Sequence, residues 1–238
     1  MRFLVLARFP EAVRQAVAVG VVGRGLSQGH FTVDGLDLTD FGLGKHRKID
    51  DKPFGGGVGL VLRADVLIPA IRWAREQLPG APVVMMTPQG EPAKQEHVQR
   101  LSQSPGAIFL CGRYEGFDER IRAHVDLELS VGDFVLSGGE LAAACMIDAA
   151  ARLIPGVLGN IESSHDESHN GCLLEHPQYT QPAEFEGDKV PDVLRSGDHG
   201  AVATWRMEQA RQRTQQRRPD LYSAYAKGQE APKSKRPG

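Results

Sequence analysis

The amino-acid sequence predicts an α/β domain with a largely parallel sheet, followed by a small helical domain. Over residues 1–160, short apolar runs alternate with segments of helical spacing, and short connections join them. Residues 161–171 are polar and non-periodic, and we expect a linker that carries an active-site loop. Residues 172–228 are rich in arginine and helical in character, and the tail 229–238 has the composition of a disordered segment.

The elements of the first domain follow from their apolar patterns. The run after Met1 predicts a buried first strand, because it is too short for a signal peptide. Residues 30–60 are polar and rich in glycine, and within them we expect a long functional loop over His46–Gly59. Helices are expected over Pro10–Val21, Val66–Gln77, Glu91–Ser102 and Leu141–Ile154, and further strands over Pro82–Met86, Ala107–Leu110 and Phe134–Leu136.

Composition limits the class of protein. The 238 residues carry a formal net charge of -2, so any nucleic-acid surface must come from local clustering of basic residues. The cysteines Cys111, Cys145 and Cys172 are odd in number and lack paired spacing, which argues against a disulfide scaffold and for a reducing compartment. No stretch is long and apolar enough to span a bilayer. We therefore expect a cytoplasmic protein without membrane contact.

Two glycine-bearing loops, Cys111–Glu119 and Val131–Leu141, follow short apolar runs and look like the rim of a ligand site. Glycine lets the backbone approach a ligand closely, and ligands of open α/β sheets sit at strand ends. Cys111 is expected to be a buried packing residue, because Phe117 stands where a cysteine-based phosphatase needs arginine. Most charged residues of the first loop are expected to form surface ion pairs, whereas Glu115 is expected to face the ligand.

The run Gly55–Gly59 could contact phosphate through its backbone N–H groups, since His46, Arg47, Lys48 and Lys52 precede it. It lacks the Gly-Lys-Ser/Thr ending of a P-loop, so hydrolysis of nucleoside triphosphates is not expected. A flexible loop and a phosphate or RNA contact both stay open as interpretations.

His165 and His169 imitate a metal-binding motif, because they are four residues apart with carboxylates between them. Their flanks carry no apolar stripe that would hold both rings on one helix face. We predict no metal site and interpret Asp166 and Glu167 as candidate proton acceptors.

The C-terminal arginines form a second candidate surface. Glu208 is their main acidic neighbour, which favours phosphate binding over an ordinary solvated helix face. They are Arg195, Arg206, Arg211, Arg213, Arg217 and Arg218.

Several segments together resemble the bacterial tRNA (guanine-N1)-methyltransferase family TrmD, of the SPOUT superfamily. They occur in the same order as in that family over roughly residues 1–225. The combination of segments is specific to the family, although no single segment identifies it. The matching stretches are Val22–Arg24, His46–Gly59, Thr87–Gly90, Cys111–Arg120, Val131–Leu141, Arg152–Gly159 and Pro191–Gly197.

The resemblance implies a SPOUT-type parallel sheet with a deep trefoil knot, one of the rare exceptions to the unknotted rule. It implies S-adenosylmethionine as methyl donor, tRNA as substrate, and a homodimer whose active sites form across the interface. The reaction implied is methylation of N1 of guanosine 37, next to the anticodon, and Mg²⁺ is suggested as an assisting ion.

The resemblance also implies roles for individual residues. Arg152 matches the catalytic arginine, and an acidic residue of the 160s loop should be the general base. Counting from Gly159, Glu167 takes the base position where the family usually has aspartate, so Glu167 is favoured and Asp166 is the alternative. Asp50, Gly55, Gly56, Gly57 and Gly59 should lie near the substrate guanine. The donor should be held by Thr87, Pro88, Gly112, Tyr114, Glu115, Val131, Gly132, Phe134, Leu136, Gly138 and Gly139.

One segment departs from the family pattern. Pro177–Pro182 reads Pro-Gln-Tyr-Thr-Gln-Pro, where Pro-His-Tyr-Thr-Arg-Pro is common, so an arginine that could contact RNA is absent. Three other functional hypotheses stay open. They are a SPOUT enzyme acting on another RNA position, a non-catalytic RNA-binding protein, and a zinc hydrolase that uses His165 and His169.

Overall fold

The computed structural model describes residues 1–159, 168–169 and 172–230. The chain divides into two compact units, residues 1–161 and 162–238. Asp166 and Glu167, the candidate bases, and His165 lie outside the described residues.

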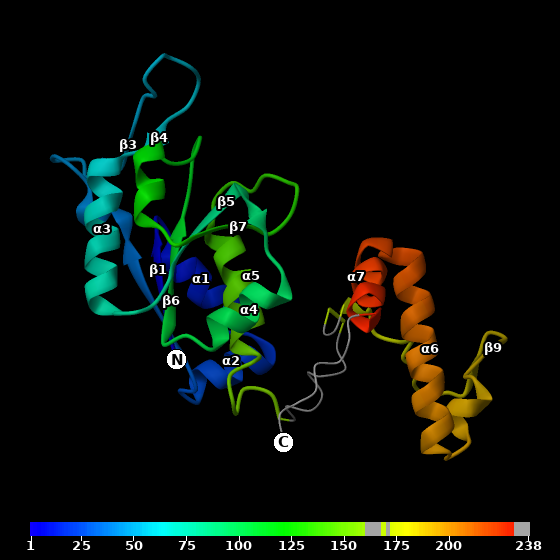
Figure 1. Ribbon diagram of the computed structural model, residues 1–238. Coiled ribbons are helices and arrows are strands. Elements are labelled where there is room, and N and C mark those ends of the chain that lie inside the picture. The colour runs from blue at the N-terminus through cyan, green and yellow to red at the C-terminus, as the bar shows by residue number, and fades with distance from the viewer. Residues whose placement is uncertain (160–167, 170–171, 231–238) are drawn as a thin grey trace, which may run out of the picture. The chain divides into compact units, whose positions relative to one another are not determined.

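The first unit is built on a five-stranded sheet in the order β2-β1-β6-β5-β7 (Figure 1). Every neighbouring pair is parallel, which confirms the α/β prediction of a parallel sheet. The strands are β1 Arg2–Ala7, β2 Thr32–Asp37, β5 Val83–Pro92, β6 Gly106–Cys111 and β7 Leu127–Ser130.

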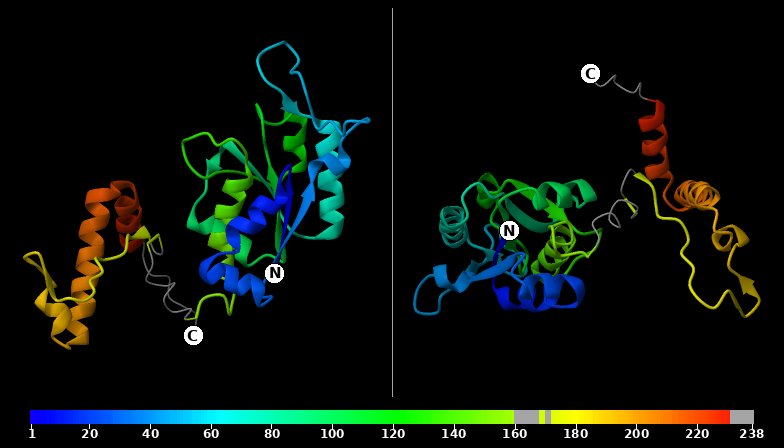
Figure 2. Two further views of the ribbon diagram at one scale, coloured as in Figure 1. Left: turned by 180° about the vertical axis from the view of Figure 1, so that it is seen from behind. Right: turned by 90° about the horizontal axis from the view of Figure 1, so that it is seen from below.

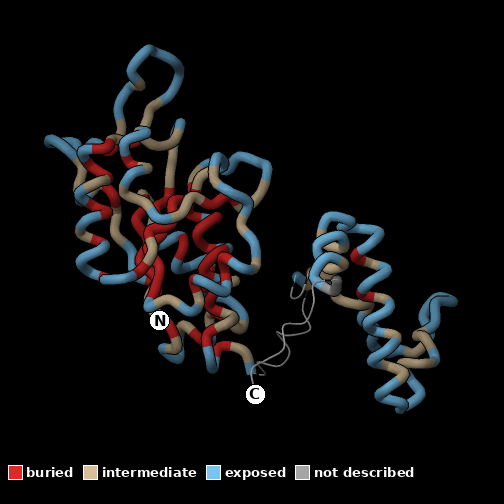
Figure 3. The backbone as a smooth tube through the Cα atoms, in the orientation of Figure 1, coloured by how far each residue is buried: buried red, intermediate tan, exposed pale blue. Residues whose placement is uncertain are grey.

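Two hydrophobic clusters cover the two faces of this sheet, because successive residues of a strand point to opposite sides. On β1, Phe3 and Val5 belong to one cluster, and Leu4 and Leu6 to the other. The first cluster includes residues of α1 Pro10–Val17, α2 Gly20–Ser27, α4 Gln95–Ser102 and α5 Glu140–Ala151; the second includes residues of α3 Ala64–Gln77. Figure 2 shows helices on both sides of the sheet, and Figure 3 shows the buried residues concentrated between them.

The structure confirms strands at the N-terminus and over 82–86 and 107–110, and helices over 66–77 and 141–151, with small shifts at their ends. Cys111 is fully buried at the end of β6, as expected.

The sequence prediction made four errors in these elements. It missed β2 and the 3₁₀ helix Leu38–Phe41 in the polar stretch 30–60, and the loop predicted over 46–59 is interrupted by the short strand β3 Asp50–Asp51. The helix predicted over 10–21 ends at Val17, and α2 begins at Gly20. The helix predicted over 91–102 begins at Gln95, because β5 continues to Pro92 beside β7.

The fourth error is the strand predicted over 134–136. These residues form an exposed loop, in which Phe134 is 56% and Val135 83% exposed. The strand at this point of the chain is β7, whose sequence Leu-Glu-Leu-Ser has too few apolar residues to stand out.

The second unit contains two long helices, α6 His199–Arg217 and α7 Pro219–Glu230, which confirms the helical prediction for this region. The side chain of Asp198 caps α6 by accepting hydrogen bonds from the N–H groups of Gly200 and Ala201. Thr214 is buried, and its hydroxyl accepts a hydrogen bond from the N–H of Leu174, which ties the segment after Cys172 to α6. A two-stranded hairpin, β8 Glu184–Phe185 and β9 Asp188–Lys189, and the 3₁₀ helix Asp192–Arg195 complete the unit.

No helix among the described residues has the length and apolar character needed to cross a membrane.

Candidate functional site

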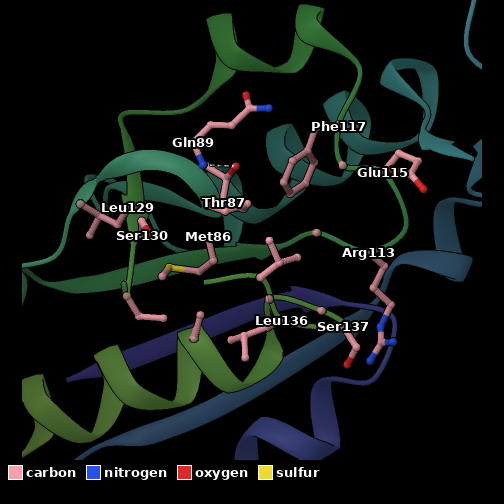
Figure 4. Close-up of a pocket in the computed structure, with 18 of the residues that line it drawn as sticks. Met86, Thr87, Gln89, Arg113, Glu115, Phe117, Leu129, Ser130, Leu136 and Ser137 are labelled. Atoms are coloured by element: carbon pink, nitrogen blue, oxygen red, sulfur yellow. Dashed lines mark hydrogen bonds between the residues drawn. The ribbon is translucent and has the colours of Figure 1, made fainter. Parts of the chain in front are cut away.

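A cavity of about 270 Å³ lies at the carboxyl ends of β5, β6 and β7. This is the edge at which open parallel sheets bind ligands. Its walls are the ends of the three strands and two loops, 112–118 after β6 and 131–139 after β7. Figure 4 shows Met86 and Thr87 from β5 and Leu129 and Ser130 from β7, with Leu136 and Ser137 on the 131–139 loop.

All eleven residues predicted to hold the methyl donor line this single cavity. They are Thr87, Pro88, Gly112, Tyr114, Glu115, Val131, Gly132, Phe134, Leu136, Gly138 and Gly139. They come from three strand ends that are up to 52 residues apart in sequence, so the sheet brings together what the sequence separates.

The two loops are joined to each other. The N–H of Gly139 donates to the carbonyl of Gly112 at 2.8 Å, and Arg113 and Gly138 form an antiparallel bridge. The guanidinium of Arg113 donates to Glu140 at 3.0 Å, and Glu140 is only 4% exposed. A buried ion pair that spans both loops resists their separation, because pulling it apart leaves a buried charge unpaired.

Burial is the main influence on the thiol of Cys111, and Glu140 of this pair adds to it. Burial, and after it the carboxylate of Glu140, raise the pKa of the Cys111 thiol well above its ordinary value. Cys111 therefore stays protonated at neutral pH and acts as a packing residue rather than a nucleophile.

The 112–118 loop is also joined to the segment before α3. Glu115 N–H donates to the carbonyl of Leu60 at 3.0 Å, and the N–H of Leu62 donates to the carbonyl of Gly116 at 2.9 Å. A Cβ added to Gly59 would lie 2.4 Å from the side chain of Glu115. Glu115 therefore packs against Gly59, which ends the loop that follows β3, and Figure 4 shows its carboxylate pointing away from the other labelled residues.

Asp50, a predicted substrate residue, also approaches the cavity wall. Partial burial raises the pKa of Tyr114, and the neighbouring Asp50 carboxylate raises it further. Tyr114 has a positive φ of 59°, a conformation in which a non-glycine residue is uncommon. Asp50 in β3 and Gly59 in the loop after it thus both lie against residues of the cavity.

Gly55, Gly56 and Gly57 are not brought into the cavity. A Cβ at Gly55 or Gly56 would meet nothing within 4 Å, and the neighbouring Phe54 is fully exposed. These glycines have positive φ angles, so the loop's path depends on them.

The sequence of this chain matches the profile of the family described as tRNA (Guanine-1)-methyltransferase TrmD over residues 1–224. The chain belongs to this family. A tRNA (guanine-N(1)-)-methyltransferase of Novosphingobium aromaticivorans is 51% identical over 222 residues, covering 93% of this chain and 90% of that protein. Proteins of the same name from Sorangium cellulosum and Brucella ovis are each 47% identical, covering 98% and 94% of this chain and 97% and 92% of their own lengths.

In this member of the TrmD family, Arg152 does not line the cavity of its own chain. It is the C-terminal cap of α5, whereas Gly139 at the cavity caps the other end. The 12 residues between the caps rise by about 18 Å. Within one chain, the predicted catalytic arginine and the predicted donor site are therefore separated by the length of α5.

Several residues of the cavity were missed by the sequence prediction. Gln89 and Phe117 lie inside the motifs that carried the resemblance, so those motifs could have indicated them. Arg122 had no such signal, because its place in the wall comes from ion pairs with Glu119 and Glu128. Across the described part of the chain, no group of three or more His, Cys, Asp or Glu is placed to hold a metal ion.

The close approach of Gly139 to β6 gives a direct test of the cavity. A Cβ at this position would lie 2.9 Å from Cys111 Cα and 3.0 Å from Gly112 N, both backbone atoms that cannot rotate away. We expect Gly139→Ala to weaken S-adenosylmethionine binding by about tenfold to a hundredfold in calorimetric titration. Gly228→Ala is the matched control, since a Cβ there meets nothing within 4 Å. Equal affinity of the two variants would contradict this assignment of the cavity.

Proposed function

We propose that this protein transfers the methyl group of S-adenosylmethionine to N1 of guanosine 37 in tRNA. Membership of the TrmD family gives the enzyme class, a tRNA (guanine-N1)-methyltransferase. We add to this class the identity of the methyl donor, the position methylated in the tRNA, and the roles of individual residues. The observation that carries it is the gathering of all eleven expected donor residues around one cavity.

The cavity suits a donor that is held largely by backbone. Gly112, Gly138 and Gly139 let the backbone of the two loops pack closely against neighbouring residues, since an added Cβ at each would lie within 3 Å of a protein atom. Two closely packed loops around the cavity favour contact between a ligand and their peptide groups. The deep trefoil knot implied by the family would enclose this cavity. When bound, S-adenosylmethionine supplies an electrophilic methyl group.

Residues outside the cavity would carry out the acid–base chemistry. Guanine N1 carries a proton and becomes nucleophilic only as that proton leaves, which builds negative charge on O6. A carboxylate, Glu167 or else Asp166, would accept the N1 proton, and the guanidinium of Arg152 would face O6. The target guanine would leave its stack to reach this point.

The separation of Arg152 from the cavity supports a homodimer with composite sites. One chain alone keeps the two about 18 Å apart, whereas a second copy could place its α5 end and 160s loop over the first copy's cavity. Apolar side chains exposed near the cavity also support an interface, namely Phe9 at 48%, Val135 at 83% and Leu141 at 59% exposure.

The unpaired cysteines Cys111, Cys145 and Cys172 support a reducing, cytoplasmic location. Mg²⁺ is not assigned a site in this proposal.

The second unit is proposed to bind the tRNA backbone through part of its arginine cluster. Arg218 pairs with Asp220 and lowers the pKa of that carboxyl to about 2, and Arg211 lies over the ring of Tyr225. Among the described residues, Arg206, Arg213 and Arg217 have no carboxylate within ion-pair distance. Their spacing of seven and four residues places them along one face of α6.

We expect tRNA affinity to fall steeply with salt through these three arginines. Replacing all three with alanine should flatten the slope of log affinity against log salt by about two to three, at 0.7 to 0.9 per phosphate contact. Arg218→Ala is the control, because its charge is already balanced by Asp220. Filter binding over a salt series measures both slopes. An unchanged slope in the triple variant would contradict the proposed surface.

The function itself is tested by methyl transfer from labelled S-adenosylmethionine to a tRNA transcript. We expect transfer to the unaltered transcript and none when guanosine 37 is replaced by adenosine. Transfer to both transcripts would indicate another RNA position. Binding of tRNA without transfer to either would indicate a non-catalytic RNA-binding protein.

A further inference from the structure

The second unit contains a cleft of its own, and we propose that it binds one unstacked nucleotide of the RNA substrate. The cleft has a volume of about 410 Å³, within the usual range for small-ligand sites. It is formed by residues 176–183, the 3₁₀ helix Asp192–Arg195 and the first half of α6. This proposal rests on the RNA substrate of the proposed function and adds to it a contact site far in sequence from the methyl-transfer cavity.

Aromatic rings make up one side of the cleft. His176 and Tyr179 line it, and Trp205 lies next to both, with ring centroids 6.5 Å and 6.4 Å away. Tyr179 is half exposed although it packs beside Trp205, so part of its ring is available to a ligand. Proteins that bind single-stranded RNA stack unpaired bases on such rings.

The charge of the cleft fits a nucleotide. Arg195 and Arg206 line it, and none of its described lining residues is acidic. Arg195 has only a distant ion pair, 3.8 Å, with an aspartate that is itself fully exposed, and both side chains are largely in solvent. Gln181 adds an amide group, which can both donate to and accept from the edge of a base, whereas the amide nitrogen of Gln178 already donates to Glu175.

The surroundings favour RNA over an acidic peptide as the occupant. Arg206 belongs both to the cleft and to the α6 stripe that continues through Arg213 to Arg217. The 11 helical steps from Arg206 to Arg217 span about 16 Å. An aromatic cleft at the end of a linear series of cations matches a base with its following phosphates, since the base stacks while the backbone runs along the charges.

Trp205 provides a direct reporter for the cleft. The chain has two tryptophans, and Trp73 packs against Phe41 in the first unit. In the full-length Trp73→Phe variant, Trp205 is the only tryptophan. We expect a single-stranded oligoribonucleotide of mixed sequence to quench its emission in a saturable way.

Matched substitutions separate stacking from general effects. Tyr179→Ala should weaken oligoribonucleotide and tRNA binding by about tenfold to a hundredfold, the range for loss of one base stack. Tyr179→Phe keeps the ring and should retain most of the affinity. Phe185→Ala removes an aromatic ring that is 64% exposed on the β8–β9 hairpin outside the cleft, and it should bind as the unaltered protein does. S-adenosylmethionine affinity should be the same in all three, and circular dichroism should show that their helix content is unchanged.

The outcomes keep this site distinct from the proposed methyl transfer. Saturable quenching that Tyr179→Ala weakens supports the nucleotide site even if no tRNA is methylated. Absence of quenching by RNA, or equal binding by Tyr179→Ala and Phe185→Ala, overturns it. Quenching by an aspartate-rich peptide but not by RNA also overturns it and assigns the cleft to a protein partner.

Discussion

Arg152→Ala is expected to reduce methyl transfer on the order of a hundredfold to a thousandfold while S-adenosylmethionine affinity stays unchanged. The guanidinium is proposed to stabilise the charge that develops on guanine O6, and removal of one such stabilising group costs a rate of this size. Because Arg152 caps α5 at the end away from its own chain's cavity, donor binding should not depend on it. Single-turnover transfer and calorimetric titration measure the two effects separately.

Two variants control for charge and for fold. Arg152→Lys keeps a cation without the planar fork of the guanidinium, so it should recover part of the lost rate. Arg100→Ala removes an exposed arginine from the last turn of α4 and should leave transfer unchanged. A rate for Arg152→Ala equal to that of Arg100→Ala would remove Arg152 from the mechanism.

Glu167→Gln is expected to lower methyl transfer on the order of a thousandfold, because the amide has the size of the carboxylate but cannot accept the N1 proton. Asp166→Asn is the neighbouring control and should retain most of the activity. Single-turnover rates at saturating donor compare the two variants. A fully active Glu167→Gln beside an inactive Asp166→Asn would make Asp166 the general base.

Mixing two defective variants, at a donor concentration well below the dissociation constant of Gly139→Ala, tests whether the base comes from the second subunit. Gly139→Ala impairs the donor cavity and Glu167→Gln the base, so a mixed dimer would contain one site with both parts intact. Random exchange makes half of the dimers mixed, and about a quarter of all sites should then be active. No recovery after exchange, with dimers confirmed by sedimentation, would place both parts in one chain.

The sequence predicted the cavity better than it predicted the sheet. The glycine loops at Cys111–Glu119 and Val131–Leu141 were recognisable because their residues are local in sequence, and both line the cavity. The edge strand β2 was not recognisable from the sequence, since only Val33 of its six residues is buried and its pattern is mostly polar. Edge strands bury little of one face, so they leave a weak apolar signal.

Ion pairs between residues far apart in the chain could not be predicted from the sequence. Arg113 and Glu140 are 27 residues apart, and only the fold shows that they join the two loops. In the same way, the sequence indicated a single cluster of C-terminal arginines. In the structure, Arg211 donates hydrogen bonds to the hydroxyl of Tyr225, and Arg218 forms an ion pair with Asp220. Which charges are free for RNA depends on helix packing rather than on composition.

The contact between Gly59 and Glu115 has a consequence for how the binding of one ligand affects the affinity for the other. It joins the loop expected to meet guanine to the wall expected to meet the methyl donor, and the hydrogen bonds of Leu60 and Leu62 make the two segments one structural piece. A ligand that fixes one segment therefore fixes the other. Thermodynamic reciprocity then requires that the donor raise the affinity for tRNA by the same factor as tRNA raises the affinity for the donor.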